Sequence, residues 1–270
     1  MWELFLCLMI ISSWNVNSVR VRLNHILEYL KKNKPNFLLL QEIKTENKNF
    51  PYSELKEIGY ESEVHGQKSY NGVAIIYNQK INNINFNIVN DLQEQSRSIS
   101  VDINYKKELI KIICVYVPNG NPVDTDKYQY KIKWLKSFEK FLVNQNKLKN
   151  KIIIGGDFNI IPNEDDVYNP EDWENDALYR IEIRKFFRKI LNEGYEDAFR
   201  LSQNDFNEEY ASMRIRSTSV GDIIQSEEDA ELLQCALVMP VGMHIVPSSW
   251  LRYIDHSYSP VEPSNYEYGE

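Results

Sequence analysis

The chain has 270 residues, 43% of them hydrophobic, which is enough for one large α/β domain with a substantial core. Residues 1–200 hold 28 basic and 27 acidic side chains, whereas residues 201–270 hold 3 and 12, so the net charge of −8 arises in the last part of the chain. The acidity therefore does not exclude a nucleic-acid-binding surface on the rest. Three widely separated cysteines form no metal or disulfide motif, and this usage favours a reducing cytoplasm. We expect Cys114, within an apolar run, to be a buried thiol.

The chain begins with an apolar stretch, Trp2 to Ile11. It is too short to span a bilayer, carries Glu3 where a signal peptide would be basic, and lacks a small-residue cleavage site. We therefore expect no membrane role. Residues 1–8 are interpreted as an extension or a mis-assigned start, and residues 9–270 as a single domain.

Strand and helix patterns then alternate along the chain. A first strand ending at Asn15 is followed by a helix whose apolar residues recur from Val19 to Leu30 and which Pro35 stops. Further helices are expected over residues 128–148 and 181–192. Short apolar or β-branched runs predict strands at Phe37–Gln41, Val73–Tyr77, Ile99–Ile103, Ile110–Val117 and Ile152–Ile154. Hairpin-length links between several strands favour two mixed, largely antiparallel sheets with outer helices, an α/β fold arranged as a four-layered αββα sandwich.

The composition changes near Asn204, beyond which lysine is absent and periodicity weakens. Residues 222–238 could form an acidic helix leading to a short apolar run. We describe residues 205–270 as a divergent acidic tail, which either completes the fold or replaces its original end.

The end of the Ile152–Ile154 strand is the most informative feature, because two glycines there precede Asp157 and Asn159. A carboxylate at this position can orient or deprotonate an attacking water, and a carboxamide can hold a phosphate oxygen. Since alternate residues of a strand point the same way, both side chains can address one site. The alternative is an Asx-turn that only caps the loop.

Three earlier strands end in polar residues as well. Glu42 follows the strand Phe37–Gln41 and is a natural Mg²⁺ ligand, because magnesium needs only one or two carboxylates besides water and phosphate. Asn15 could join Glu42 through the metal or a water molecule. The Tyr116 phenol can donate to a phosphate oxygen, although packing is the commoner role of tyrosine.

Flanking residues extend this candidate site. Arg20 and Lys44 could contact DNA phosphates, although a solvated surface charge is the alternative for each. Asn71, in a turn, and Asn119, after Tyr116, are further candidates for DNA binding.

Taken in order, these segments resemble the motifs of the exonuclease III family of AP endonucleases, in the endonuclease/exonuclease/phosphatase superfamily with a DNase-I-like fold. The resemblance covers residues 9–201 and is carried by Ser13–Arg20, Leu39–Lys44, Tyr70–Ile75, Val115–Gly120, Gly156–Ile160 and the segment Asp166–Pro170 with Trp173.

The resemblance implies Mg²⁺- or Mn²⁺-dependent hydrolysis of the phosphodiester 5′ to abasic sites, with a 3′→5′ exonuclease, on double-stranded DNA. By motif position, Asn15 and Glu42 would serve the metal, Tyr116 and Asn159 the scissile phosphate, and Asp157 the water. A cytoplasmic monomer is expected.

The family's C-terminal motifs match this chain less well. A Phe-Trp-Asp segment is missing, and Asp255-His256 is the one candidate for two different elements. If it is the terminal Asp-His, His256 is the catalytic histidine and Asp255 a metal-side carboxylate. If it is the earlier Arg-Ile-Asp-His element, the catalytic histidine is missing. Two other functions therefore stay open: a phosphodiesterase of the same superfamily acting on another phosphate ester, and a catalytically damaged paralogue with a replaced C-terminus.

Overall fold

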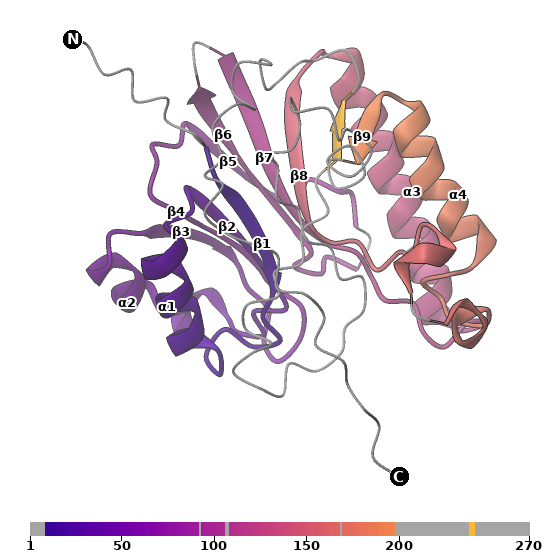
Figure 1. Cartoon of the computed structure of the whole chain (residues 1–270), viewed down its shortest axis with the longest axis horizontal. Coiled ribbons are helices and arrows are strands. Elements are labelled where there is room, and N and C mark those ends of the chain that lie inside the picture. Colours follow the sequence, from indigo (N-terminus) through magenta and orange to yellow (C-terminus); the bar gives the residue numbers. More distant parts are fainter. Residues whose placement is uncertain (1–8, 92, 106–107, 168, 198–237, 241–270) are drawn as a thin grey trace, which may run out of the picture.

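Two β-sheets stack face to face between two pairs of helices (Figure 1). The computed structural model describes residues 9–91, 93–105, 108–167, 169–197 and 238–240. The expected four-layered αββα sandwich is confirmed in this part of the chain. None of its helices is long and apolar enough to cross a membrane.

The first sheet has four strands in the order β1-β2-β4-β3. The parallel pair β1 and β2 lies at one side, and the other neighbours pair antiparallel. The strands are β1 (Ile11–Asn15), β2 (Phe37–Gln41), β3 (Glu61–His65) and β4 (Val73–Tyr77), and the helices beside this sheet are α1 (Leu23–Asn33) and α2 (Tyr52–Glu57).

The second sheet has six strands in the order β5-β6-β7-β8-β10-β9, with β7 and β8 parallel and the other pairs antiparallel. Its strands are β5 (Asn83–Phe86), β6 (Ser98–Tyr105), β7 (Glu108–Tyr116), β8 (Lys151–Asp157), β9 (Tyr195–Asp197) and β10 (Val238–Pro240). Two helices cover its outer face, α3 (Asp126–Lys147) and α4 (Ile181–Asn192). Short 3₁₀ turns occur at Asn47–Asn49, Glu164–Asp166 and Pro170–Trp173.

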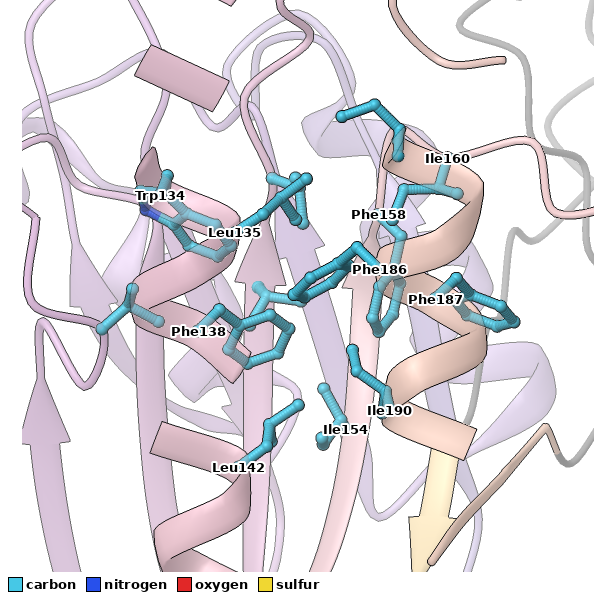
Figure 2. Close-up of a cluster of buried hydrophobic side chains, with 14 of the residues drawn as sticks. Trp134, Leu135, Phe138, Leu142, Ile154, Phe158, Ile160, Phe186, Phe187 and Ile190 are labelled. Atoms are coloured by element: carbon cyan, nitrogen blue, oxygen red, sulfur yellow. The ribbon is translucent and has the colours of Figure 1, made fainter. Parts of the chain in front are cut away.

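Three apolar layers make up most of the core, and the strands supply them by alternation; a smaller fourth cluster contains Ile161, Leu178 and Tyr179. On β7, Ile112 and Cys114 face the first sheet, whereas Ile113 and Val115 face the helices α3 and α4. Figure 2 shows the layer under these helices, where Phe138 of α3, Phe186 of α4 and Phe158 pack together. Both faces of β7 are buried from Ile112 to Tyr116 and both faces of β8 from Ile152 to Gly156, and these parts of the strands carry no charged residue. Cys114 is buried, as expected.

The helix α4 has the expected bounds, and α3 differs from its expected range by two residues or fewer at either end. The helix expected from Val19 begins only at Leu23, which corrects the prediction. Val19 is fully buried, and its N–H donates to the carbonyl of Ile43, so the loop that follows β2 holds this residue outside the helix. Of the predicted acidic helix over residues 222–238, only Val238 lies within the described residues, where it belongs to β10.

Candidate active site

The two parallel strand pairs bring four polar residues together. Strand β1 packs against β8 where the sheets meet, and the carboxyl ends of both pairs lie at the same edge. Gly155 permits β8 to approach the first sheet closely, because a Cβ there would lie 2.6 Å from Leu39 Cδ1 of β2. The edge carries Asn15, Glu42, Tyr116 and Asp157.

Asn15 is the centre of this cluster. Its Nδ2 donates to Glu42 Oε1 and to Asp157 Oδ2, both at 2.9 Å, and so joins residues 27 and 142 positions away in the sequence. The amide therefore bridges two carboxylates that repel each other, and its two N–H groups offset part of this repulsion. The two carboxylates and the amide form one cluster, in which Asn15 bonds directly to Glu42, whereas the sequence suggested a link through a metal or a water molecule.

Glu42 is held as an anion. Its Oε1 also accepts the Tyr116 hydroxyl at 2.9 Å, and its Oε2 lies 2.9 Å from Lys44 Nζ. Burial alone would raise the pKa of Glu42, but the hydrogen bonds from Asn15, Lys44 and Tyr116 and the charge of Lys44 outweigh it, and the net pKa is lowered. Glu42 has a φ of 51°, so the chain turns directly after β2 and presents the carboxylate at the sheet edge.

Asp157 has the opposite electrostatic balance. Burial raises its pKa, and the negative charge of Glu42 adds to this effect. Hydrogen bonds from Asn15 and from the backbone of Asn159, together with the charge of Lys131, oppose the shift without cancelling it. The cluster thus combines one carboxylate that favours its ionised form with one that takes up a proton more readily than usual.

Asn159 lies beside Asp157, but not for the reason that strand alternation suggested. Its φ of 47° ends the strand geometry, and its N–H donates to Asp157 Oδ1 at 2.9 Å, which is the Asx-turn that we considered as the alternative. Its Oδ1 accepts Asn119 Nδ2 at 3.2 Å, and its Nδ2 donates to the carbonyl of Val117. The carboxamide is therefore anchored next to the carboxylate.

Lys131 of α3 is a residue that the sequence analysis missed. It is fully buried, and its Nζ donates to the backbone carbonyls of Asn119 at 2.9 Å and Asn159 at 2.6 Å. Burial lowers its pKa to about 7, although the charges of Asp157 and Asp176 work in the other direction. A signal was present, because Lys131 continues the spacing of the apolar residues Leu135, Phe138 and Leu142 toward the start of the helix.

The candidates for DNA binding are less closely grouped. Arg20 is exposed on the loop between β1 and α1. Lys44 forms an ion pair with Glu42 and donates a hydrogen bond to Asn17 Oδ1. Asn71 Nδ2 donates to the side chains of Gln67 and Gln95. Asn119 is exposed and reaches the cluster through Asn159. Asp255 and His256 lie outside the described residues.

The cluster fits a hard divalent cation. Among the described residues there is no group of three His, Cys, Asp or Glu side chains that could enclose a metal ion. Magnesium does not need one, since it retains several waters and uses one or two carboxylates together with substrate phosphate. The ionised Glu42 carboxylate and the amide oxygen of Asn15 are oxygen ligands of the required kind.

The sequence of this chain is similar to those of known nucleases. The model of the Endonuclease/Exonuclease/phosphatase family matches residues 12–232. Exodeoxyribonuclease III of Haemophilus influenzae is 28% identical over 218 residues, which are 78% of this chain and 82% of that protein. A DNA-(apurinic or apyrimidinic site) endonuclease of Dictyostelium discoideum is 31% identical over 195 residues, 70% of this chain and 52% of that protein.

Solved structures agree with the sequence relatives. An AP endonuclease from Archaeoglobus fulgidus superposes with a TM-score of 0.71 at 29% identity, and 86% of either chain is covered. A 3′-5′ exonuclease from Neisseria meningitidis gives the same TM-score and identity, with 86% of this chain and 87% of that chain covered. With four-fifths of its sequence matched by one family model and its sheets arranged as in these nucleases, the chain belongs to the Endonuclease/Exonuclease/phosphatase family.

Proposed function

We propose that this chain is a metal-dependent DNA phosphodiesterase of base-excision repair, which hydrolyses the phosphodiester 5′ to abasic sites and removes nucleotides from 3′ ends. The observation that carries the proposal is the Asn15 amide bonded to both Glu42 and Asp157. It unites three sequence motifs in one cluster. The names of the relatives, exodeoxyribonuclease III and AP endonuclease, support the substrate.

Glu42 and Asn15 would hold the metal, which we propose to be Mg²⁺ or Mn²⁺. When bound, the ion neutralises the charge that develops on the phosphate and on the leaving oxygen. The lowered pKa of Glu42 supports this role, because a ligand carboxylate must be ionised before it binds a cation. If Asp255 belongs to the terminal motif, it adds a second carboxylate at this side.

Asp157 would take the proton of the attacking water. Its raised pKa makes the carboxylate a better base than an exposed aspartate, and the bonds from Asn15 and Asn159 fix both of its oxygens. If the terminal alignment holds, His256 would be the catalytic histidine. Its contribution stays a prediction from the sequence.

Tyr116 and Asn159 would bind the scissile phosphate through the phenol and the carboxamide. Without DNA, the phenol donates to Glu42 and the carboxamide to the carbonyl of Val117. The proposal therefore requires Tyr116 to exchange the carboxylate for a phosphate oxygen when the substrate and the metal arrive. Asn119, bonded to Asn159, would contact the same phosphate group.

Arg20, Lys44 and Asn71 would contact phosphates of the DNA backbone, with Lys44 next to the scissile bond because it pairs with Glu42. Phosphate contacts of this kind position the duplex without reading its sequence, in keeping with a lesion-specific enzyme. We further propose that residues 9–270 act as a single domain, as a monomer, in the cytoplasm.

The test is nicking of a duplex that contains one abasic site, in the presence of Mg²⁺. The variants Glu42→Gln and Asp157→Asn should each lose at least about 100-fold in kcat, in line with the loss of a charge-stabilising or proton-transfer group. Glu57→Gln is the matched control. It makes the same change at an exposed glutamate of α2 and should retain full activity. Undiminished nicking by either site variant would refute the assignment. Turnover of small phosphodiesters in place of abasic DNA would favour another phosphate ester as the substrate.

A further inference from the structure

Lys131 occupies a place in the helix α3 where an apolar side chain would ordinarily stand. It shares the buried face with Leu135 and Phe138, and it is itself fully buried. The side chain packs closely, since a Cβ on Gly120 would lie only 2.6 Å from Lys131 Cδ. The absence of a side chain at Gly120 thus leaves room for the lysine stem.

The ammonium group joins two separate loops. Asn119 belongs to the segment that follows β7, and Asn159 to the segment that follows β8, yet their backbone carbonyls converge on the same Nζ at 2.9 and 2.6 Å. The Nζ keeps N–H donors for both carbonyls whether or not it is protonated, and its bonds are stronger when it is charged. One side chain therefore fixes the distance between the two loops.

These loops carry the polar groups of the site. Asn119 Nδ2 donates to Asn159 Oδ1, and the N–H of Asn159 donates to Asp157 Oδ1. The N–H of Val117 donates to the carbonyl of Asp157, which ties the β7 segment to the same residue. A movement of the Asn159 backbone would consequently displace the Asp157 carboxylate.

Burying a lysine costs free energy, because its charge is taken out of water. Only well-placed partners compensate for this loss. Burial lowers the pKa of Lys131 to about 7, and the carboxylates of Asp157 and Asp176 only partly oppose this effect. A leucine or methionine would fill the same helix position without this cost, but it would leave two carbonyls without a donor. The lysine is thus explained by what it holds, not by the core that surrounds it.

We propose that Lys131 is a positioning residue, whose Nζ ties the loops after β7 and β8 together and so holds Asn159 and Asp157 in the geometry required for phosphodiester hydrolysis. This inference rests on the proposed function. It assigns to Lys131 no contact with DNA, water or metal.

The experiment compares Lys131→Met with Lys136→Met, the same substitution at an exposed position of the same helix. Two quantities are measured under conditions where both variants are folded. The first is hydrogen exchange of the Asn159 backbone amide, which needs no substrate and no metal. The second is kcat and KM on the abasic duplex.

We expect exchange at Asn159 to accelerate at least about 10-fold in Lys131→Met and to stay unchanged in Lys136→Met. We expect kcat to fall about 10- to 100-fold, as for a displaced catalytic group, with KM within about threefold of the control. On an Asn159→Ala background the loss in kcat caused by Lys131→Met should shrink, because the two residues act through one network.

Unchanged exchange at Asn159 overturns the proposal, and so does a kcat equal to that of Lys136→Met. A wild-type chain that fails to nick abasic DNA refutes the proposed function alone, since the exchange measurement then decides the role of Lys131. Should Lys131→Met not fold, Lys131→Gln, which keeps a donor amide, is measured in the same way. It should give a smaller acceleration, and none would again overturn the proposal.

Discussion

Gly156 offers a sharp test of how the fold positions the site. This residue pairs with Val115 across the parallel strands β7 and β8, one position before the pair formed by Tyr116 and Asp157. Its φ is +149°, and a Cβ added there would lie 2.0 Å from the carbonyl oxygen of Val115 and 2.9 Å from its N and C atoms. Gly156→Ala therefore forces backbone against backbone, with no flexible side chain to move aside.

The magnitude follows from this contact. Ordinary van der Waals contact begins at 3.4 Å, so the strands must part by about 1.4 Å (3.4 − 2.0). This breaks the end of the ladder at about 1 kcal/mol for each hydrogen bond lost. Backbone strain at an unfavourable φ adds about 1–3 kcal/mol. We expect a total destabilisation of about 3–5 kcal/mol, a large share of the roughly 5–15 kcal/mol that stabilises a typical domain. A shift of this size at Asp157 should also reduce kcat about 100-fold.

Urea unfolding with two glycine controls measures the effect. Gly155→Ala brings a Cβ to 2.6 Å from the tip of Leu39, a side chain that can repack, at an expected cost of about 1–3 kcal/mol. Gly59→Ala has a φ of +86° but open space, and should cost about 1–2 kcal/mol. If Gly156→Ala were no more destabilising than Gly59→Ala, the close pairing of β7 and β8 would be wrong.

Two further variants test the electrostatics. Tyr116→Phe removes one of the hydrogen bonds that lower the pKa of Glu42. The pH midpoint of the thermal stabilisation by Mg²⁺ should therefore move upward. An unchanged midpoint would mean that the phenol does not act on the carboxylate. Lys131 has a folded pKa of about 7 against an ordinary value of 10.5, so the unfolded chain binds more protons between these limits and its contribution to stability rises with pH. Relative to Lys131→Met, the wild type should gain about 1.4 kcal/mol per pH unit in unfolding experiments between pH 7 and 10, and a pH-independent difference would contradict the depressed pKa.

Much of the fold could be predicted from the sequence, because strand and helix periodicities are strong where burial is complete. The runs in β2, β4 and β8 and the second half of β7 are apolar on both faces, and α3 and α4 have one apolar stripe each. Strands that are only partly buried lack such a pattern and were missed. The edge strands β3 and β5 are partly exposed and rich in polar residues, so nothing in their pattern separates them from loops.

The candidate site was predictable as a set of residues but not as a network. Polar residues at the ends of buried strands identified Asn15, Glu42 and Asp157, whereas nothing in the sequence shows which of them bond directly. The direct bond from Tyr116 to Glu42 depends on the stacking of two sheets, which only coordinates reveal. Lys131 was missed because a lysine in a helix is ordinarily solvated, and its apolar spacing was the sole indication of burial.

The stacking of the sheets is also what distinguishes the two carboxylates. Both carboxylates accept a hydrogen bond from the Asn15 amide, so these two bonds do not explain why their pKa values shift in opposite directions. Glu42 stands at the edge of its sheet, where Lys44 and Tyr116 reach it as well, and its anion is favoured. Asp157, on the facing sheet, gains only the Asn159 N–H and the more distant charge of Lys131, against greater desolvation and the repulsion of Glu42. The two strand ends thus give the carboxylates different surroundings although they share one amide. As a result, Glu42 is suited to bind a cation and Asp157 is suited to accept a proton.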